Sequence, residues 1–439
     1  MVDYPDPRQA DREYEEFVLR NENEEFPYKS SDVVCAVVDR TSRLPEGLTQ
    51  LPSGEIIATD DLEEYNRLYG LPSRVEWPLS PDPAIPPGAV SGSTAEPRGW
   101  GPAEVTVHDI TPAAWSEEDE ELRPNALALA VLPDGRQLLA SGHDGAARVW
   151  NIGDGAEVRM VSGHSEWVLS VALATLSDGK TVVATGGKDG LARVWSVREH
   201  QALQEIEAQR RPVNSVAWAF PPGDVPWLVA GGDDATVGIW DVDSGLSRRS
   251  FEVGEPSINI VWSVAAAVLA DGHVYVVAGV EEMDGGSVYV WDASTGTRLH
   301  KHAVSLSDDR LRHISPRVAM AVLPDRSFRV AAIAGPEVRV WDGQTGQEVL
   351  SLSVPWERSN GDVALTTLPD LRVAVAATSG QQTLVCDTES GAALARLDHQ
   401  GSDYHPVVEL AARPDGGLLL AVGRTDDHPA RIARLDIRW

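Results

Sequence analysis

A tryptophan returns along this chain at nearly constant intervals, and that period limits the folds available to it. The recurring tryptophans are Trp150, Trp195, Trp240, Trp291 and Trp341. Cys386 and Leu435 stand at the next two places, so the seven positions lie 45 to 51 residues apart. A period of this length indicates a repeat architecture, in which each copy buries its apolar face against its neighbours.

Each copy has the turn signals of a small antiparallel sheet. An Asp-Gly-like turn is followed by an apolar run such as residues 181–184, then by a glycine-rich turn and an alternating strand that ends at the tryptophan position. An Asp-x-x-x-Gly turn comes next, for example from Asp241 to Gly245. Gly and Asp tolerate the backbone angles of tight hairpins. Four strands per copy are typical of a propeller blade, so the sequence predicts an all-β, seven-bladed β-propeller.

The seventh copy predicts how the ring closes. It ends at Trp439, directly after its third strand, and so lacks an outer strand of its own. The segment 103–110, AEVTVHDI, alternates in polarity and precedes the first copy. We expect it to supply the missing strand, because an open sheet edge is a liability in β proteins.

The chain resembles the WD40-repeat family from about residue 100 to residue 439. The second copy carries the family's pattern best, with His164, Thr185, Asp189 and Trp195. The resemblance implies that these residues form a hydrogen-bonded network that locks one blade. The Asp–Trp part of the pattern recurs as Asp144 with Trp150 and as Asp234 with Trp240. From the fourth copy on both the His and the Asp are missing, so those blades are expected to rely on packing.

The first quarter of the chain differs in kind. Residues 1–78 mix short apolar runs of helical and strand spacing, which predicts a small α+β domain of no recognised family. Residues 79–98 are rich in Pro, Gly and Ser, which is typical of a linker. The propeller is therefore expected to span residues 99–439.

Charge narrows the choice of partner. The chain has 67 acidic and 37 basic residues, for a net charge of -30. Such a chain repels phosphate backbones and anionic lipid, so we expect neither nucleic acid nor membrane as a partner. A protein or peptide partner, particularly a basic one, is more compatible with this negative charge. The acidity could equally serve only to keep the protein soluble. The acidic N-terminus and the two cysteines fit the cytoplasm, and the excess of arginine over lysine is typical of a bacterial gene.

Catalytic and metal motifs are scarce, so no catalytic residue, metal site or cofactor is predicted. The sequence has no Walker A loop and no Gly-x-Ser-x-Gly elbow. His300, His302 and His313 could converge on a metal, but an exposed outer strand explains them better. Asp241 and Asp243 belong to a repeat turn rather than to a calcium loop. Cys35 has no histidine partner in the sequence and is interpreted as a buried thiol.

A binding surface is better supported. The resemblance implies a partner on the face around the central channel, near the start of each inner strand. An alignment of the copies places two sets of residues on this face: those at the start of the inner strands and those just before the second hairpin turn. Together they are Arg123, His143, Trp167, Leu169, Lys188, Asn214, Trp262 and Tyr404. Aromatic residues and arginine are typical of interface hot spots. The alternative is that Trp167 and Trp262 pack between blades.

The function that follows is a non-catalytic scaffold for protein–protein interaction. Two alternatives stay open. One is an acidic inhibitor or immunity-type protein that neutralises a basic target. The other is a propeller enzyme with a small-molecule site at the channel mouth, where His143, His405 or Glu166 could act as acid or base. The oligomeric state is not predicted.

Overall fold

The computed structural model describes most of the chain beyond residue 103. The described residues are 48–50, 56–58, 104–111, 124–132, 134–176, 178–199, 202–256, 258–283, 285–304, 315–354, 361–379, 382–398, 406–423 and 431–438. In the first unit, Met1–Pro87, these include the short antiparallel pair β1 (Leu48–Gln50) and β2 (Ile56–Ala58). The predicted α+β domain and linker otherwise lie outside the described residues, and their limits stay predictions.

The second unit, Gly88–Trp439, contains seven four-stranded antiparallel sheets among its described residues. Blade 1 consists of β4 (Ala126–Val131), β5 (Gln137–Gly142), β6 (Ala146–Asn151) and β7 (Glu157–Ser162). Blade 2 consists of β8 (Val168–Thr175), β9 (Thr181–Gly187), β10 (Ala192–Ser196) and β11 (Ala202–Ile206). Blade 3 consists of β12 (Val213–Ala219), β13 (Trp227–Gly232), β14 (Thr236–Asp241) and β15 (Ser247–Glu252). Blade 4 consists of β16 (Ile260–Val268), β17 (Val274–Glu282), β18 (Gly285–Asp292) and β19 (Thr297–Val304).

The remaining three sheets continue the series. Blade 5 consists of β20 (Arg317–Val322), β21 (Phe328–Ala334), β22 (Glu337–Asp342) and β23 (Glu348–Ser353). Blade 6 consists of β24 (Asp362–Thr367), β25 (Val373–Ser379), β26 (Gln382–Asp387) and β27 (Ala393–Asp398). Blade 7 consists of β28 (Val407–Ala412), β29 (Leu418–Gly423), β30 (Arg431–Arg438) and β3 (Glu104–Asp109).

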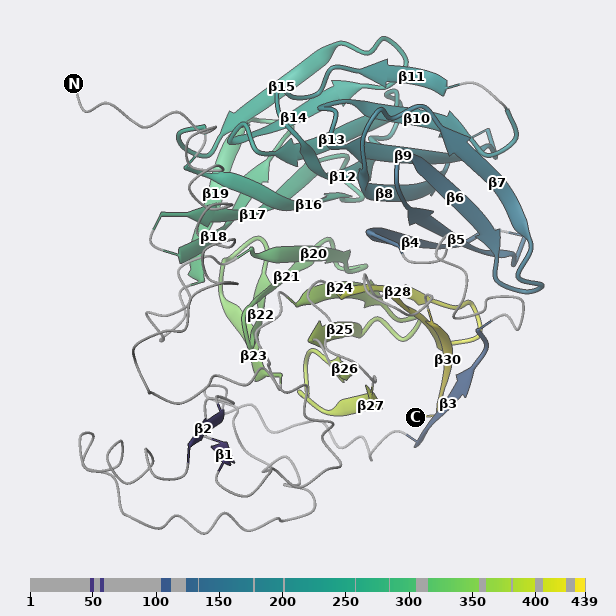
Figure 1. Cartoon of the computed structure of the whole chain (residues 1–439), viewed down its shortest axis with the longest axis vertical. Coiled ribbons are helices and arrows are strands. Elements are labelled where there is room, and N and C mark those ends of the chain that lie inside the picture. Colours follow the sequence, from purple (N-terminus) through teal and green to yellow (C-terminus); the bar gives the residue numbers. More distant parts are fainter. Residues whose placement is uncertain are drawn as a thin grey trace, which may run out of the picture. The chain divides into compact units, whose positions relative to one another are not determined.

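The seven blades form a closed ring, which confirms the predicted propeller. Each inner strand contacts the inner strand of the next blade, and β28 of the last blade contacts β4 of the first. Figure 1 shows the blades following one another around a common centre. Buried Val, Leu, Ile and Ala from facing sheets fill the space between neighbouring blades. No helix in the described part of the chain is long and apolar enough to cross a membrane.

The first and last parts of the propeller meet in blade 7. Strand β3 pairs antiparallel with β30, so that Val107 lies opposite Leu435 and Asp109 opposite Ala433. Figure 1 shows these two strands side by side at the edge of the ring. The Arg431 guanidinium donates to the Asp109 carboxylate at 2.8 Å across the same pair. The strand expected from the alternating residues 103–110 is thus the outer strand of blade 7.

The tryptophan period is correct for six blades and wrong for the seventh. In blade 5, Trp341 lies opposite Val330, and Cys386 lies opposite Val375 at the same place in blade 6. In blade 7 the residue at this register is Ala433, opposite Leu420, and not Leu435. The third strand of blade 7 has no Asp-x-x-x-Gly turn after it, because its outer strand comes from β3. The sequence therefore offers no turn from which to count the position.

Serine side chains join the inner strands of four successive blades, 2 to 5. Ser170 of β8 accepts a hydrogen bond from the amide of Val216 in β12 at 3.0 Å. Ser215 of β12 accepts from Val264 of β16 at 2.9 Å. Ser263 of β16 accepts from the amide of Val318 in β20 at 3.1 Å. The three serines occupy one register position, opposite Gly186, Gly231 and Gly279.

The facing glycines allow the inner strands to come this close. A Cβ at Gly231 would lie 2.4 Å from Cγ1 of Val261, on the next blade. At Gly186 it would lie 2.7 Å from Cγ1 of Val213. Both distances are shorter than van der Waals contact, so these glycines are required for close approach rather than for a turn.

We expect Ser215→Ala to destabilise the ring measurably. The substitution leaves the buried amide of Val264 without its acceptor, which costs about 1–3 kcal/mol. The free energy of unfolding in urea measures the effect. Ser162→Ala is the control, because Ser162 is exposed on the outer strand β7. Equal unfolding midpoints for both variants would contradict a stabilising role for the serine.

Closure by β3 can be tested by truncation. A chain that starts at residue 112 exposes the edge of β30, whereas a chain that starts at residue 99 keeps the β3–β30 pair. We expect the shorter chain to unfold at a lower temperature and to associate at high concentration, because an unpaired edge recruits other strands. Thermal melting and light scattering measure both effects. Identical melting and a monomeric state for both chains would show that the ring does not depend on β3.

Candidate functional site

The loops that the sequence predicts to bind a partner lie on one face of the ring. The loops concerned are 143–145, 163–167, 188–191, 207–212 and 233–235, which we call the channel face. Backbone hydrogen bonds tie them together: Val168 donates to His143, Lys188 to Trp167, and Asp233 to Pro212. The loops that precede the inner strands and the second hairpin turns therefore lie on the same face of the ring, as the alignment of the copies requires.

Blade 2 contains the hydrogen-bonded network that the resemblance implies. The Trp195 indole donates to Thr185 Oγ1 at 3.0 Å, and Thr185 Oγ1 lies 2.8 Å from His164 Nε2. His164 Nδ1 lies 2.9 Å from Asp189 Oδ1. Thr185 can donate to Nε2, and Nδ1 lies between the Asp189 carboxylate and an N–H of Arg193 at 2.8 Å. The network joins the loop before β8 to the turn before β10.

The two titratable members of this network favour a neutral histidine beside an ionised aspartate. Burial lowers the pKa of His164, although the hydrogen bond to Asp189 works in the opposite direction. Burial raises the pKa of Asp189, but hydrogen bonds from His164 and Arg193 outweigh it and leave that pKa below its usual value. The Arg193 guanidinium is 3.0 Å from Asp189 Oδ2 and 2.7 Å from Glu205.

Blade 1 builds an equivalent network from different residues. The Trp150 indole donates to Ser141 Oγ at 3.0 Å, and this hydroxyl lies 2.8 Å from His143 Nε2. His143, which the sequence assigned to partner binding, is therefore half-buried and supports its own blade. Asp144 is exposed beside it. The Asp–Trp pairing predicted for this blade is replaced by a Ser–His pairing.

Blade 3 uses its aspartate only within the turn. Asp234 Oδ1 accepts hydrogen bonds from the backbone amide and the hydroxyl of Thr236, at 3.0 and 2.7 Å. The Trp240 ring instead covers Gly238, where a Cβ would lie 2.0 Å from the indole. The repeated Asp–Trp spacing thus corresponds to three different local arrangements in blades 1 to 3.

Blade 4 does not rely on packing alone, contrary to the expectation from the sequence. Glu282 accepts hydrogen bonds from Tyr289 Oη at 2.7 Å and from Ser287 Oγ at 2.9 Å. Lys301 lies 2.9 Å from the same carboxylate and 5.0 Å from the centre of the Tyr289 ring. Burial raises the pKa of Glu282, but these hydrogen bonds outweigh it and lower the pKa overall. A carboxylate on β17 thus takes the place of the missing His and Asp.

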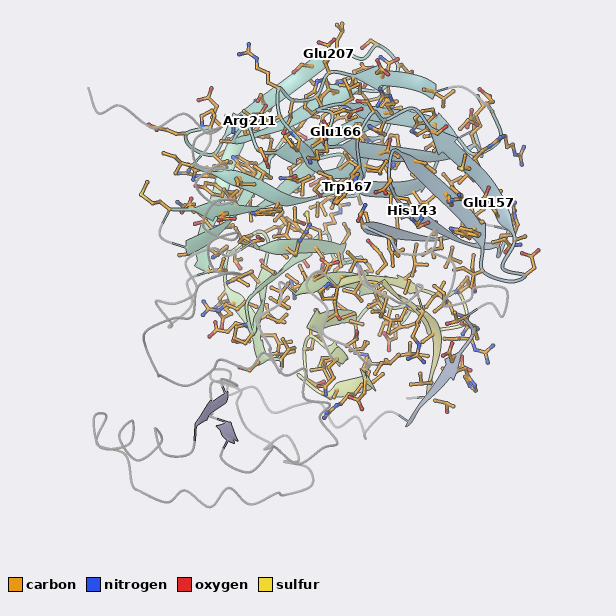
Figure 2. The ribbon with its side chains drawn as sticks, in the orientation of Figure 1. His143, Glu157, Glu166, Trp167, Glu207 and Arg211 are labelled. Atoms are coloured by element: carbon orange, nitrogen blue, oxygen red, sulfur yellow. The ribbon has the colours of Figure 1, made fainter. Side chains whose placement is uncertain are left out.

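Trp167 is the large aromatic side chain that the channel face exposes. Its side chain is 54% exposed, and the residue lies on a short loop between β7 and β8. The Lys188 ammonium lies 5.7 Å from the centre of its ring and 3.5 Å from the Glu166 carboxylate. Figure 2 shows Trp167 and His143 nearer the centre of the ring than Glu157 and Glu207. Of the two arrangements considered for Trp167, the structure shows the exposed one.

Leu169, Asn214 and Trp262 occupy one register position, and each is the extra residue of a β-bulge at the start of its inner strand. Asn214 is buried, and its amide donates to Asp233 at 2.7 Å and to the carbonyl of Val261 at 3.1 Å. It therefore joins blade 3 to blade 4 and is not available for direct contact with a partner. Leu169 is half-buried.

Trp262 also belongs to a joint between blades. Its indole donates to Glu281 Oε2 at 2.6 Å, and the Arg317 guanidinium of blade 5 lies 5.9 Å from the ring centre. Arg317 also donates to the Trp262 carbonyl at 3.0 Å. For Trp262 the structure thus shows packing between blades. Arg123, Tyr404 and His405 lie outside the described residues, so their assignment stays a prediction.

A polar cluster near the channel was not found from the sequence. Glu409 of β28 stands at the register position that alanine occupies in the other six inner strands, namely Ala128, Ala172, Ala217, Ala265, Ala319 and Ala364. Two positions before that alanine, blade 6 has Asp362 and blade 5 has Arg317. Asp362 accepts a hydrogen bond from the Val408 amide at 2.9 Å, as the serines do elsewhere.

The two carboxyl groups of this cluster compete for ionisation. Burial raises the pKa of Glu409 to about 8, and the nearby Asp362 carboxylate raises it further in the same direction. Burial also raises the pKa of Asp362, whereas the charge of Arg317 and the Val408 amide lower it. Asp362 is therefore the group that ionises first, and Glu409 keeps its proton near neutral pH.

Two hollows lie between blades in the described part of the propeller. One, of about 260 Å³, lies at the joint of blades 6 and 7 and is lined by Val107, Leu397 and Arg431 among others. The other, of about 600 Å³, lies on the channel face between blades 2 and 3. No three His, Cys, Asp or Glu side chains of the described residues group closely enough to hold a metal ion. His300 and His302 instead lie against blade 5, where His302 stacks on Trp341 at 4.8 Å.

The described residues define a seven-bladed β-propeller with an exposed indole on its channel face. The family model for "WD domain, G-beta repeat" matches residues 124–151, 155–196 and 201–241. The matched repeats lie in blades 1 to 3, and together with the seven-bladed fold they support a propeller of the WD40-repeat family. The second and third matches each begin near an outer strand and end with the third strand of the next blade. A search among curated proteins gives no match to the chain.

We expect the stability of the propeller to fall as the pH rises through the range set by Glu409. The folded-state pKa of about 8 lies above the ordinary value of 4.5, so the folded chain holds a proton that the unfolded chain releases. The resulting stabilisation is complete below pH 4.5 and is lost toward pH 8. Glu409→Gln keeps a neutral side chain and should flatten this part of the pH profile.

Thermal melting between these limits measures the effect. Glu348→Gln is the matched control, because Glu348 is exposed on the outer strand β23. A Glu409→Gln profile that parallels the parent chain across this range would contradict the assignment of the proton to Glu409.

Proposed function

We propose that this protein is a non-catalytic interaction scaffold that binds a protein partner on the channel face of blades 1 to 3. WD40 propellers commonly serve as scaffolds for protein interaction. The observation that carries the proposal is Trp167, an exposed indole on a rigid loop. Tryptophan is enriched among the residues that dominate the binding energy of interfaces. We further propose that the protein acts in the cytoplasm, which its composition supports.

The loop that holds Trp167 is organised before any partner arrives. The Trp167 carbonyl accepts a hydrogen bond from Lys188, and the next residue, Asp189, belongs to the buried network of blade 2. Three residues before Trp167, His164 anchors the other end of the loop in that network. A contact residue held in this way loses little conformational freedom on binding, which favours affinity.

Two of the residues considered for catalysis are engaged in structure. His143 supports Trp150 through Ser141. Glu166 is exposed and pairs with Lys188 at 3.5 Å. These contacts favour a binding role for this face over acid–base chemistry. Neutralisation of a basic target would be one form of the same binding role.

Trp167→Ala should abolish partner capture while leaving the fold intact. Loss of a central interface tryptophan costs on the order of 2 kcal/mol or more, which is about a 30-fold loss of affinity. Affinity capture from an extract of the source cells, with quantification of stoichiometric partners, measures the loss. The melting temperature should stay close to that of the parent chain, because the indole is exposed.

Two further variants complete this experiment. Leu246 is 68% exposed and lies at the turn between β14 and β15, on the opposite face of the ring. Leu246→Ala should therefore leave capture of the partner unchanged. Trp262→Ala should lower the melting temperature, because it breaks the contacts with Glu281 and Arg317. A partner that binds the Trp167→Ala variant as well as the parent chain would exclude this face.

A further inference from the structure

The joint between blades 6 and 7 lacks the tryptophan that lies between blades in most of the ring. At the register position of that tryptophan, β30 has Ala433. In two other joints the tryptophan reaches the outer strand of the preceding blade. Trp291 stacks on Phe251 with ring centres 4.9 Å apart, and Trp341 stacks on His302 at 4.8 Å. An alanine at this position is too short to fill the same space.

Leu397 is the residue of blade 6 that corresponds to Phe251 and His302. Each of the three stands four residues after the outer-strand residue that pairs with the tryptophan position, namely Ser247, Arg298 and Ala393. Leu397 is half-buried and packs against the apolar cluster that contains Ala433 of blade 7. Where Phe251 and His302 meet an indole, Leu397 therefore has an alanine across the joint.

The hollow of about 260 Å³ between blades 6 and 7 lies at this place. Leu397 and Ala433 line it from the two sides of the joint, together with Leu420, the residue opposite Ala433 on β29. Leu420 is fully buried, whereas Val107 at the opening is 42% exposed. An apolar cavity of about 150 Å³ can hold one benzene ring. This hollow, which we call the blade 6–7 pocket, is therefore large enough for a single aromatic ring.

An apolar side chain stands where two other blades bind the indole N–H. In blades 1 and 2 the indole donates to Ser141 and Thr185, which lie two residues beyond the residue opposite the tryptophan. In blade 7 that position is Val422, which is buried and lines the pocket. An N–H group placed here would leave water without gaining this acceptor, which is unfavourable. A ring without polar atoms fits this wall better than an indole.

The charged residues of the lining are all exposed at the opening. Asp109 and Arg431 form an ion pair at 2.8 Å, and Asp398 adds a second carboxylate. The three groups together carry a net negative charge, so the opening disfavours a ligand that bears a carboxylate. The buried part of the pocket selects by shape and apolarity, and the opening selects against anions.

We propose that the blade 6–7 pocket binds one apolar phenyl ring that carries no negative charge. The ring takes the volume that an indole fills in other joints and contacts Leu397, Leu420 and Val422. An unfilled apolar hollow forgoes the dispersion contacts of a close-packed interior, and a ring of this size restores them. The pocket belongs to blades 6 and 7, whereas the proposed partner binds blades 1 to 3, so this inference does not rest on the proposed function.

Fluorobenzene is the probe, and ¹⁹F NMR of its titration with the full chain measures binding. We expect saturable binding with a dissociation constant on the order of 1 mM, as is reasonable for a ligand of so few atoms. 4-Fluorobenzoate keeps the ring but adds a carboxylate, and it should bind at least about tenfold more weakly. Absence of saturation by fluorobenzene up to about 10 mM, or equal binding of the two probes, overturns the proposal.

Matched variants assign the binding to this pocket. Ala433→Trp supplies the tryptophan that blade 7 lacks, so it should abolish fluorobenzene binding and raise the melting temperature by a few degrees. Val158→Trp adds the same residue to the outer strand of blade 1, where Val158 is 41% exposed, and should leave binding unchanged. Fluorobenzene binding by Ala433→Trp that equals binding by the parent chain overturns the proposal.

A second variant covers the case in which the bulky substitution prevents folding, which melting curves reveal. Val422→Thr keeps the shape of the wall but adds the hydroxyl found at this position in blade 2. It should weaken fluorobenzene binding several-fold, because the ring then faces a polar group. Unchanged binding in Val422→Thr would place the ring elsewhere and would contradict the assignment.

A pentapeptide distinguishes the two sources of such a ring. It carries 4-fluorophenylalanine flanked by Ser and Gly on both sides. If the peptide binds to the parent chain and not to Ala433→Trp, the pocket takes a phenylalanine side chain of a protein. If only fluorobenzene binds, the pocket takes a small molecule. Trp167→Ala should bind both probes as the parent chain does, so failure of the proposed function and failure of this inference give different results.

Discussion

The whole propeller depends on contact between inner strands of neighbouring blades. An isolated four-stranded sheet of this length leaves both faces exposed, so each blade is stable only when its two neighbours cover it. The serine-to-amide hydrogen bonds from Ser170, Ser215 and Ser263 fix the register of one blade against the next. In blade 6 Asp362 performs the same task with a carboxylate. The apolar core can form only where this register is kept, because side chains of facing sheets must interdigitate.

The polar contacts within each blade are less uniform than the contacts between neighbouring blades. Trp195 is held through Thr185 and His164, whereas Trp150 is held through Ser141 and a histidine from its own turn. Blade 4 uses the carboxylate of Glu282 instead. These arrangements share one requirement: a polar group buried near the second hairpin turn must have a partner. Different residues meet that requirement, so the family pattern weakens along the chain while the fold persists.

Features that repeat in every blade could be predicted from the sequence, whereas features that occur in a single blade could not. Blade number followed from turns and from the tryptophan period, which are local signals. The assignment of Leu435 failed because blade 7 has no turn after its third strand. Asn214 and Trp262 were placed on the correct register position, yet contacts with the neighbouring blade bury the first and engage the second. Glu409 gave no signal in the sequence, since its six counterparts become visible as a ring of alanines only when the strands are aligned in space.

Three bulges bear on where we propose the interaction surface. The inner strands β8, β12 and β16 carry a bulge one residue before their serine, whereas the pairing of β20, β24, β28 and β4 begins only at the register position of that serine. A bulge strengthens the local twist and redirects the side chains around it. At β12 and β16 the redirected residue is used to join blades. At β8 the bulge follows directly on Trp167, where the same change of direction accompanies an indole that stays in solvent. Blade 2 therefore combines the complete hydrogen-bonded network with the exposed indole of Trp167.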